Sequence, residues 1–467
     1  MNRAPGRLRF DHAPVVTHDE RFQRGRAARA ALPRSAHGRY EADAHRDPLG
    51  VLDRQHETRL PDLVPLRVAR MLQNPFAFYR GTAAIQAADL AGEANTGAGV
   101  VLCGDAHIGN FGLFASPERS MVFDLNDFDE AAFGPWEWDV KRLVTSVVIA
   151  ARSRGATEAQ TRRAASLAAH AYRDALHRSL ELDVTDRFFQ AAVVQGGRQF
   201  GKQTQKLVKA AVKSSEKRTS ARVIARITET ADDGSLHLIE SPPRLTHVGP
   251  EIESRVAEVI DLYRASVTPD VSLLLAQHTI TDVARRVVGV GSVGSRCFIV
   301  VLTGPHGEPL ILQLKEASDS VIHEFGRAPK NPISGVNPDT FSANHGYRVT
   351  ANQRILQAVS DPFLGHVTFE GYGFYVRQFR DRNVSFEIAD MADETFEDYA
   401  YACATILARA HSRSPDGAFI AGYIGRGTAF TDAVIEWSHA YADQSLADFE
   451  ALRAAVVAGR FESAPLA

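Results

Sequence analysis

One short polar segment between two apolar runs constrains the fold most strongly. Residues 99–114 read GVVLCGDAHIGNFGLF, which predicts a strand, a loop and a second strand. The loop carries Asp105, His107 and Asn110. An acid, an imidazole and an amide at the end of a buried strand are typical of a catalytic or metal-binding loop. The chain must therefore build a sheet here, although the runs around this segment are helical in pattern.

A second acidic segment follows. Residues 121–131 read MVFDLNDFDEA, which predicts a strand that ends in carboxylates. Asp127 and Asp129 are candidates for binding a metal ion, and Asp124 competes with Asp127 because both come at the end of the same apolar run. A Gly-Pro turn then leads to a helical run that begins at Asp139, which we expect to brace the preceding loop.

The character of the chain changes near residue 271, where β-patterned runs begin. Gly289, Gly291 and Gly294 have the spacing G-x-G-x-x-G, and the run SRCFIVVL after them predicts a strand, not the helix of a dinucleotide-binding fold. Lys315 lies on the next strand-like run, LILQLKEA. A glycine-rich hairpin and a lysine on a neighbouring strand are suited to binding phosphates. The alternative is an ordinary turn beside an exposed lysine.

These groups together meet the needs of phosphoryl transfer, in which an Asp deprotonates the acceptor hydroxyl while an Asn and a second Asp hold Mg²⁺ against the nucleotide. The loop GDAHIGN resembles the GD-x-H-x-x-N loop of aminoglycoside-type phosphotransferases, and the acidic segment resembles their metal-binding segment. For His107, a loop residue that only bonds to the backbone is an equal alternative. The predicted site residues are catalytic Asp105 and His107, metal-binding Asn110, Asp127 and Asp129, and nucleotide-binding Gly289, Gly291, Gly294 and Lys315.

The order of these motifs departs from that of kinase-like proteins, in which the glycine-rich hairpin and the lysine precede the catalytic loop. The helical run CATILARAHSRS, which contains His411, resembles the L-x-x-x-H helix that ordinarily leads into that loop, yet no second loop follows it. We therefore expect an α+β, protein-kinase-like, two-lobed fold that is circularly permuted, with a small β-rich lobe and a larger, mainly helical lobe.

The expected organisation has five parts. They are a partly flexible N-terminal arm over 1–60, the catalytic-loop and metal-Asp part of the large lobe over 61–156, a helical insertion over 157–270, the small nucleotide-binding lobe over 271–385, and the remaining helices of the large lobe over 386–467. The insertion carries a basic stripe at helical spacing, which is either a solvated helix face or a contact for phosphate or nucleic acid. Its members are Lys202, Lys206, Lys209, Lys213 and Lys217.

At the scale of the whole chain, the sequence resembles a bacterial family known only as a domain of unknown function. The resemblance runs from about Leu60 to Ala440 and rests on four long motifs. They read LVPLRVARMLQNPFAFYRGTA, CGDAHIGNFG, VFDLNDFDEAAFGPWEWDVKRL and YVRQFRD. It implies membership of the family but no substrate.

Three assignments stay open at this stage. The acid that pairs with Lys315 is either Glu324 or absent, because the clearer helical run YRVTANQRILQAVSD offers Gln353 and no acid before its final residue. Arg80 is either a phosphate contact or a salt-bridge partner. Three residues are expected near the hinge between the lobes, namely Arg377, Arg380 and Asp381.

The predicted function is an ATP- and Mg²⁺-dependent phosphotransferase that acts on a hydroxyl of an unknown, small-molecule acceptor. The alternatives are a non-catalytic, pseudokinase-like nucleotide-binding protein, an AMP-transferring enzyme on the same fold, and a metal-dependent phosphoesterase. The last is disfavoured because the later histidine cluster of that class is missing from the sequence.

Composition indicates where the protein acts and which partners to expect. Three widely spaced cysteines, no apolar run suited to a signal peptide and no stretch long enough to span a bilayer predict a cytoplasmic protein without a membrane partner. The net charge of −3 gives no overall attraction to nucleic acid, so a nucleic-acid partner is not expected. The oligomeric state is not predicted.

Overall fold

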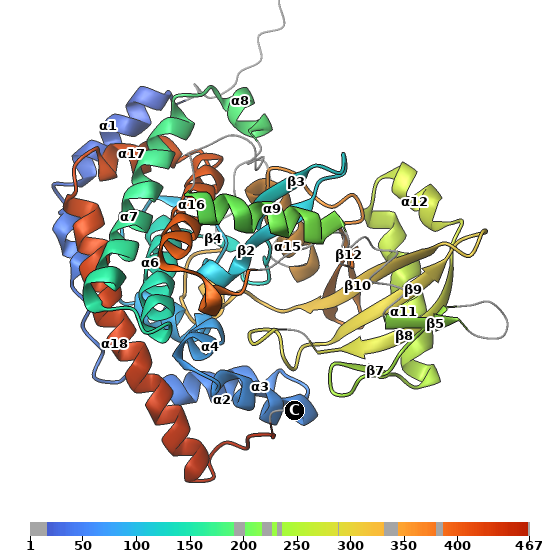
Figure 1. Ribbon diagram of the computed structural model, residues 1–467. Coiled ribbons are helices and arrows are strands. Elements are labelled where there is room, and N and C mark those ends of the chain that lie inside the picture. Colours follow the sequence, from blue (N-terminus) through green and yellow to red (C-terminus); the bar gives the residue numbers. More distant parts are fainter. Residues whose placement is uncertain are drawn as a thin grey trace, which may run out of the picture.

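Two regions of different architecture lie side by side in the structure, which is a computed structural model (Figure 1). One region is built on a six-stranded sheet, with one two-stranded pair packed on it, and the other is mainly helical and holds two further two-stranded pairs. The predicted α+β class is therefore confirmed. The structure describes residues 16–190, 201–216, 227–230, 236–287, 289–330, 344–379 and 386–465.

The six-stranded sheet is antiparallel throughout. Its strands run in the order β11-β12-β10-β9-β8-β7. Their bounds are β7 (Leu245–His247), β8 (Thr279–Arg286), β9 (Cys297–Thr303), β10 (Pro309–Ala317), β11 (Gly365–Phe369) and β12 (Tyr372–Gln378). We call this sheet and the helices packed on it the sheet region.

The sheet forms where it does because its central strands are apolar on both faces. On β9, Val300 and Leu302 point into one apolar cluster, whereas Ile299 and Val301 point into another on the opposite face. Helix α11 (Pro250–Tyr263) covers the first face with its own apolar stripe. The sheet region therefore begins before residue 271, and the predicted boundary is too late because α11 and β7 already belong to this region.

Helix α15 (His345–Leu356) packs beside β10, β11 and β12. The glycine-rich segment lies between β8 and β9, and Lys315 lies on β10, the third strand counted from β8. The strand-like runs predicted around the glycine-rich segment and Lys315 are thus strands of one sheet.

Two strand pairs carry the predicted catalytic segments. Strand β1 (Gly99–Leu102) pairs with β4 (Ala132–Pro135), and β2 (Phe111–Ala115) pairs with β3 (Met121–Leu125). Because β2 and β3 are inserted between β1 and β4, the loop after β1 and the loop after β3 lie at the same junction of the two pairs. Nested pairing therefore brings the two polar loops together.

The core of the helical region is formed by α6 (Trp136–Ser153), α7 (Glu158–Leu180), α16 (Asp393–Ser412) and α18 (Ala429–Val457). Helix α6 is buried along almost all of its length, so it forms the centre on which α7 and α18 pack. The helices within the predicted N-terminal arm contact α17 and α18.

The remaining helices are α1 (His18–Ala28), α2 (Pro48–Glu57), α3 (Val64–Met71), α4 (Pro75–Arg80), α5 (Ala83–Leu90), α8 (Val184–Phe189), α9 (Lys202–Glu216), α12 (Pro269–Leu275), α13 (Val321–Glu324) and α17 (Gly417–Ile424). Two short strands, β5 (Thr228–Thr230) and β6 (Leu236–Leu238), also pair.

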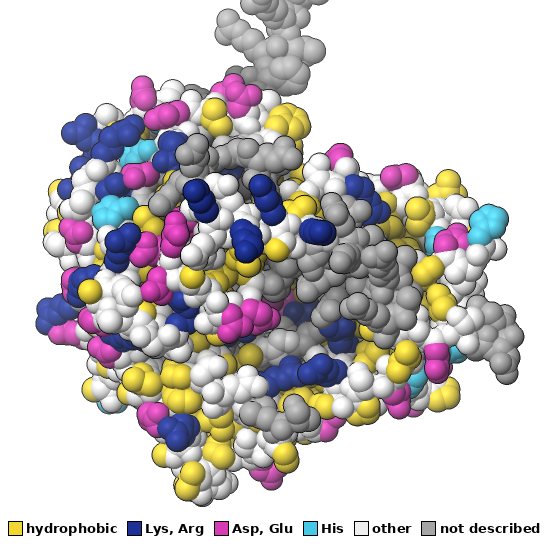
Figure 2. Space-filling view, in the orientation of Figure 1, with side chains coloured by type: hydrophobic (Ala, Val, Ile, Leu, Met, Phe, Trp, Pro, Cys, Tyr) yellow, Lys and Arg dark blue, Asp and Glu magenta, His cyan; other side chains and the backbone are white. Residues whose placement is uncertain are grey.

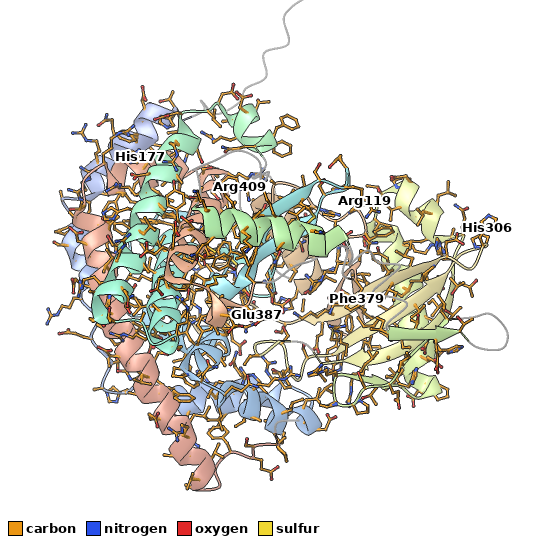
Figure 3. The ribbon with its side chains drawn as sticks, viewed as in Figure 1. Arg119, His177, His306, Phe379, Glu387 and Arg409 are labelled. Carbon is orange, nitrogen blue, oxygen red and sulfur yellow. The ribbon has the colours of Figure 1, made fainter. Side chains whose placement is uncertain are left out.

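A buried ion pair fastens α16 to β3. Arg409 of α16, labelled in Figure 3, donates to Oδ1 of Asp124 at 2.6 Å and to the carbonyl of Leu356 at 3.0 Å. The other carboxylate oxygen accepts from the backbone N–H of Ala358 at 3.0 Å. Asp124 is fully buried and Arg409 nearly so. This carboxylate is thus committed to holding β3, α15 and α16 together.

We predict that Arg409→Met destabilises the protein by about 3–5 kcal/mol, because Asp124 would then be a buried charge without its partner. Urea unfolding followed by circular dichroism measures the effect. The double variant Asp124→Asn with Arg409→Met should recover a large part of the loss, and Arg453→Met, on an exposed helix face, is the control. A loss below about 1 kcal/mol in the single variant would contradict this role.

Candidate functional site

One buried carboxylate fixes the backbone of the loop after β1. Asp139, in the first turn of α6, accepts from the backbone N–H groups of Cys103 at 2.7 Å and Gly104 at 3.0 Å. His411 Nε2 lies 3.2 Å from the same carboxylate, and the hydroxyl of Tyr172 lies 2.8 Å from His411 Nδ1. The predicted brace is therefore present, and the helix that carries His411 lies directly against the loop.

Gly104 is required at the turn of this loop. Its φ is 78°, and a Cβ there would lie 2.0 Å from the carbonyl oxygen of Glu130. The close approach sets the loop after β1 against the loop after β3.

Asp105 lies at the end of this turn, with its two carboxylate oxygens in different situations. Oδ1 accepts from Arg142 Nε at 2.8 Å, and the Arg142 guanidinium lies 3.8 Å from the centre of the Tyr79 ring. Oδ2 lies 3.7 Å from His107 Nε2 and accepts no hydrogen bond from the residues that the structure describes. Burial raises the pKa of Asp105, and the charge of Arg142 opposes part of that shift.

His107 is held as a neutral imidazole with a defined tautomer. Its Nδ1 accepts from the backbone N–H of Gly109 at 3.0 Å, so the ring proton is on Nε2, which faces Asp105. Burial, together with the charges of Arg80 and Arg142, lowers the pKa of His107 well below its ordinary value. His107 thus bonds to the backbone of its own loop and also presents a donor to the site.

Asn110 and Asp127 lie where the two loops meet. The Asn110 side chain donates from Nδ2 to the carbonyl of Asp105 at 2.7 Å, which leaves its Oδ1 for a cation. The Asn110 carbonyl accepts from Asn126 N at 2.9 Å. The Asp127 carboxylate accepts only from the N–H of Asp129, at 3.3 Å, among the described residues. Since Asp124 is paired with Arg409, Asp127 is the better of the two competing carboxylates.

The Asp127 carboxyl lies in an environment that disfavours its charge. Burial and the neighbouring Asp129 carboxylate raise its pKa, while Lys315 and Arg377 lower it in part. An amide oxygen and a carboxylate oxygen are ligands that Mg²⁺ accepts, and Mg²⁺ typically takes only one or two carboxylates and completes its shell with phosphate and water. Across the described part of the chain, no three His, Cys, Asp or Glu side chains form a metal cluster of their own.

Lys315 reaches across from the sheet region and pairs with Asp129. The Asp129 carboxylate also accepts from the Tyr375 hydroxyl at 2.8 Å and from Ser292 Oγ at 3.1 Å. Burial would raise the pKa of Asp129, but Lys315 and these hydrogen bonds lower it overall. Burial likewise opposes the charge of Lys315, yet Asp129 raises the pKa of the amine. Both Asp129 oxygens are therefore taken by protein donors, unlike those of Asp127.

Glu324 does not fill the place expected for it. It lies on α13 and faces a cavity of about 700 Å³, whereas the described ion pair of Lys315 is with Asp129. Neither alternative that the sequence left open describes the structure, because the acid that pairs with the lysine comes from the loop after β3 and not from a helix of its own region. No predicted site residue lines this cavity, which lies between residues 40–54, α5 and α13.

The glycine-rich segment rests on helices of the first eighty residues. The carbonyl of Gly294 accepts from Leu60 N at 2.8 Å, and that of Gly289 accepts from Arg70 at 3.0 Å. Gly294 has a φ of 93°, and a Cβ there would lie 2.8 Å from that of Arg59. This packing places Ser292 over Asp129, so the segment lies above the junction of the two loops.

Of the residues expected near the hinge, Arg377 is described and the other two are not. Arg377 on β12 donates to Gln313 at 2.9 Å and to the carbonyl of Asn126 at 3.4 Å, which joins the sheet to the acidic loop. Arg380 and Asp381 lie outside the described residues. Phe379 and Glu387, both labelled in Figure 3, are described on either side of them.

The predicted basic stripe is a solvent-facing helix face in the part that is described. Figure 2 shows lysine side chains, in dark blue, along α9. The opposite side of the helix packs through Ala211 on the β2–β3 pair and through Thr204 on Asp398. The exposed members are Lys202, Lys206, Lys209 and Lys213, and Lys217 falls outside the described side chains.

Sequence reasoning missed Arg142, Tyr375 and Ser292. Arg142 follows Asp139 by three residues, so the two lie on one face of α6, and a basic residue one turn after the bracing acid was the available signal. Tyr375 and Ser292 reach Asp129 only through the tertiary fold, so no local pattern marks them.

One comparison with known proteins gives a match. Residues 59–455 match the model of a family described as "Uncharacterized protein conserved in bacteria (DUF2252)". The resemblance expected from the four sequence motifs is thereby confirmed. No curated protein and no solved structure matches the chain. No described helix has the length and apolar character needed to cross a bilayer.

We predict that Glu130→Gln stabilises the protein in a pH-dependent way. Burial raises the pKa of Glu130 to about 7, although the N–H of Val321 and the charge of Arg348 oppose the shift. Because the unfolded carboxyl titrates near 4.3, the folded state binds more protons between about pH 4.3 and 7, and wild-type stability falls over that window as pH rises. Relative to wild type, the free energy of unfolding of the variant should be higher by about 3–4 kcal/mol at pH 8 and unchanged at pH 4.

Chemical denaturation at a series of pH values measures this difference. Glu450→Gln, on an exposed face of α18, is the matched control and should show a flat difference. A Glu130→Gln difference that does not change between pH 4 and pH 8 would show that this carboxyl titrates normally.

Proposed function

This chain belongs to that family of uncharacterised bacterial proteins, and we propose that it is an ATP- and Mg²⁺-dependent phosphotransferase that acts on a hydroxyl group of a small-molecule acceptor. One observation carries the proposal. Three segments that are distant in the sequence meet at one point, where Lys315 pairs with Asp129 beside Asp127 and the loop of Asp105 and Asn110. Those residue types in that arrangement are the groups that phosphoryl transfer uses.

The arrangement of elements supports a kinase-like fold that is circularly permuted. The glycine-rich segment lies between the first and second strands of the run β8, β9 and β10, and the lysine lies on the third, as in protein kinases. Helix α16 carries His411 to the catalytic loop although the loop precedes it by about 300 residues. A circular permutation whose new termini fall between that helix and the loop accounts for this order of the elements along the chain.

The predicted nucleotide-binding groups face the acidic loops. In the proposal, backbone N–H groups between Gly289 and Gly294, together with Lys315, bind the phosphates, for which Lys315 exchanges part of its contact with Asp129. Asn110 Oδ1 and the Asp127 carboxylate would hold Mg²⁺, which neutralises charge that develops on the phosphates during transfer.

Asp105 is the proposed base. Its Oδ2 has no donor among the described residues and takes the proton of the acceptor hydroxyl as the new O–P bond forms and the bond to the leaving nucleotide diphosphate breaks. Arg142 holds Oδ1 and thereby orients the carboxylate. The raised pKa of Asp105 makes it a stronger base than an exposed Asp.

We predict that the wild-type protein binds ATP in an Mg²⁺-dependent manner in isothermal titration calorimetry. Asp127→Ala should lose the metal dependence, so that its Kd for ATP is the same with and without Mg²⁺, because the carboxylate that binds the cation is gone. The matched control is Glu450→Gln, which should bind as wild type does. If ATP does not bind the wild type with any divalent ion, the proposal fails.

We also predict that Asp105→Asn binds ATP within about twofold of wild type but loses roughly 10²–10⁴-fold in turnover, since the amide cannot accept the proton. Turnover is followed by ³¹P NMR of the nucleotide products during incubation with a panel of hydroxyl compounds. ADP is the expected product. AMP with pyrophosphate would indicate AMP transfer instead, and tight binding without any product would indicate a nucleotide-binding protein.

A further inference from the structure

Arg80, at the end of α4, lies beside the proposed catalytic base and has no partner among the described residues. Its guanidinium makes no ion pair and no hydrogen bond with the residues that the structure describes, and its Nε is buried. The neighbouring arginines differ. Arg142 donates to Asp105, to Gln86 and to the carbonyl of Tyr79, and the fully buried Arg67 likewise donates to side chains and to a backbone carbonyl.

The position of Arg80 is set by contacts on two sides. A Cβ on Gly109 would lie 3.5 Å from Arg80 Nε, and a Cβ on Gly291 would lie 3.6 Å from the Arg80 carbonyl oxygen. Gly109 belongs to the catalytic loop and Gly291 to the glycine-rich segment. Arg80 therefore lies between the two segments that the proposed function assigns to the acceptor and to the nucleotide phosphates.

A second donor faces the same place. His107 carries its proton on Nε2, and that atom lies 3.7 Å from Asp105 Oδ2, which is longer than a hydrogen bond. Within the described part of the chain, neither the imidazole N–H nor the guanidinium has an acceptor, and Asp105 Oδ2 has no donor. A Cβ on Gly109 would lie 3.1 Å from His107 Nδ1 as well as 3.5 Å from Arg80 Nε, so the two side chains lie beside the same glycine.

The chemistry of these donors selects an anion. Guanidinium groups bind phosphate and similar oxyanions through paired N–H donors, and a charge that is partly removed from water gains when an opposite charge pairs with it. A neutral ligand would leave Arg80 unpaired. Asp105, the carboxylate of the loop that Arg80 lies beside, is already held by Arg142.

We propose that Arg80 and His107 form an oxyanion site, which takes a phosphate group at the point of transfer. The inference deepens the proposed function and rests on it for the identity of the neighbouring groups. The phosphate belongs either to the nucleotide, as its terminal phosphoryl group, or to a phosphorylated acceptor. Both have the same chemistry, and binding measurements separate them.

The test compares Arg80→Gln and Arg80→Lys with wild type in calorimetric titrations with three probes: Mg·ADP, a non-hydrolysable Mg·ATP analogue, and inorganic phosphate added to the ADP complex. If the site holds the terminal phosphoryl group, Arg80→Gln weakens the binding of the ATP analogue at least tenfold and the binding of ADP less than twofold. If it holds an acceptor phosphate, both nucleotides bind to the variant as to wild type, and the binding of inorganic phosphate is weakened at least tenfold. Arg80→Lys should recover part of either loss, because it restores the charge without the paired donors.

Controls separate this inference from the proposed function. Arg453→Gln, exposed on α18, should match wild type with every probe. If no nucleotide binds the wild type but inorganic phosphate alone binds in an Arg80-dependent manner, the oxyanion site stands and the nucleotide function fails. The inference is overturned if Arg80→Gln binds all three probes as wild type does. It is also overturned if the wild type binds none of the three probes and does not bind inorganic phosphate alone. Thermal melting within a few degrees of wild type shows that each variant is folded.

Discussion

The carboxylate of Asp139 is the interaction on which the site depends. It is almost completely buried, and it lies against two backbone N–H groups of the loop after β1 and the imidazole of His411. A carboxylate in the first turn of a helix is also stabilised by the helix dipole. One turn further along α6, Arg142 holds Asp105. The beginning of a single buried helix thus sets both the path of the loop and the direction of its acid.

The contact between the two regions has a different character. Lys315 and Asp129 form a buried ion pair, which by itself contributes little net stability because both charges lose their water. Its partners Tyr375 and Ser292 come from β12 and from the glycine-rich segment, so three parts of the sheet region converge on one residue of the acidic loop. Under the proposed function, this polar cluster is the place where a charged ligand would enter between the two regions.

The sequence predicted what local pattern determines. The strand, loop and strand around Asp105, the acidic strand end at Asp127, the helix before His411 and the exposed lysines of α9 all follow from periodicity and from turn residues. The features that depend on contacts between distant parts of the chain were missed or misplaced. Glu324 was a reasonable partner for Lys315 by chain order alone, but the insertion of β2 and β3 between β1 and β4 brings Asp129 there instead. The start of the sheet region was placed too late for a similar reason, because α11 has the pattern of any amphipathic helix and only its packing assigns it to the sheet.

The charged groups that have no ion-pair partner lie on two different sides of the junction of the two loops. Asp105 is matched by Arg142, and Asp129 is matched by Lys315. Among the described residues, Asp127 is left without an ion pair on one side, and Arg80 is left without one on the other. A ligand that presents a cation to the first and an oxyanion to the second is complementary to this arrangement, and a nucleotide phosphate that carries a divalent metal ion has that polarity. An uncharged ligand would leave both partly buried charges unmatched, so the electrostatics of the site favour the metal-bound phosphate over a neutral molecule.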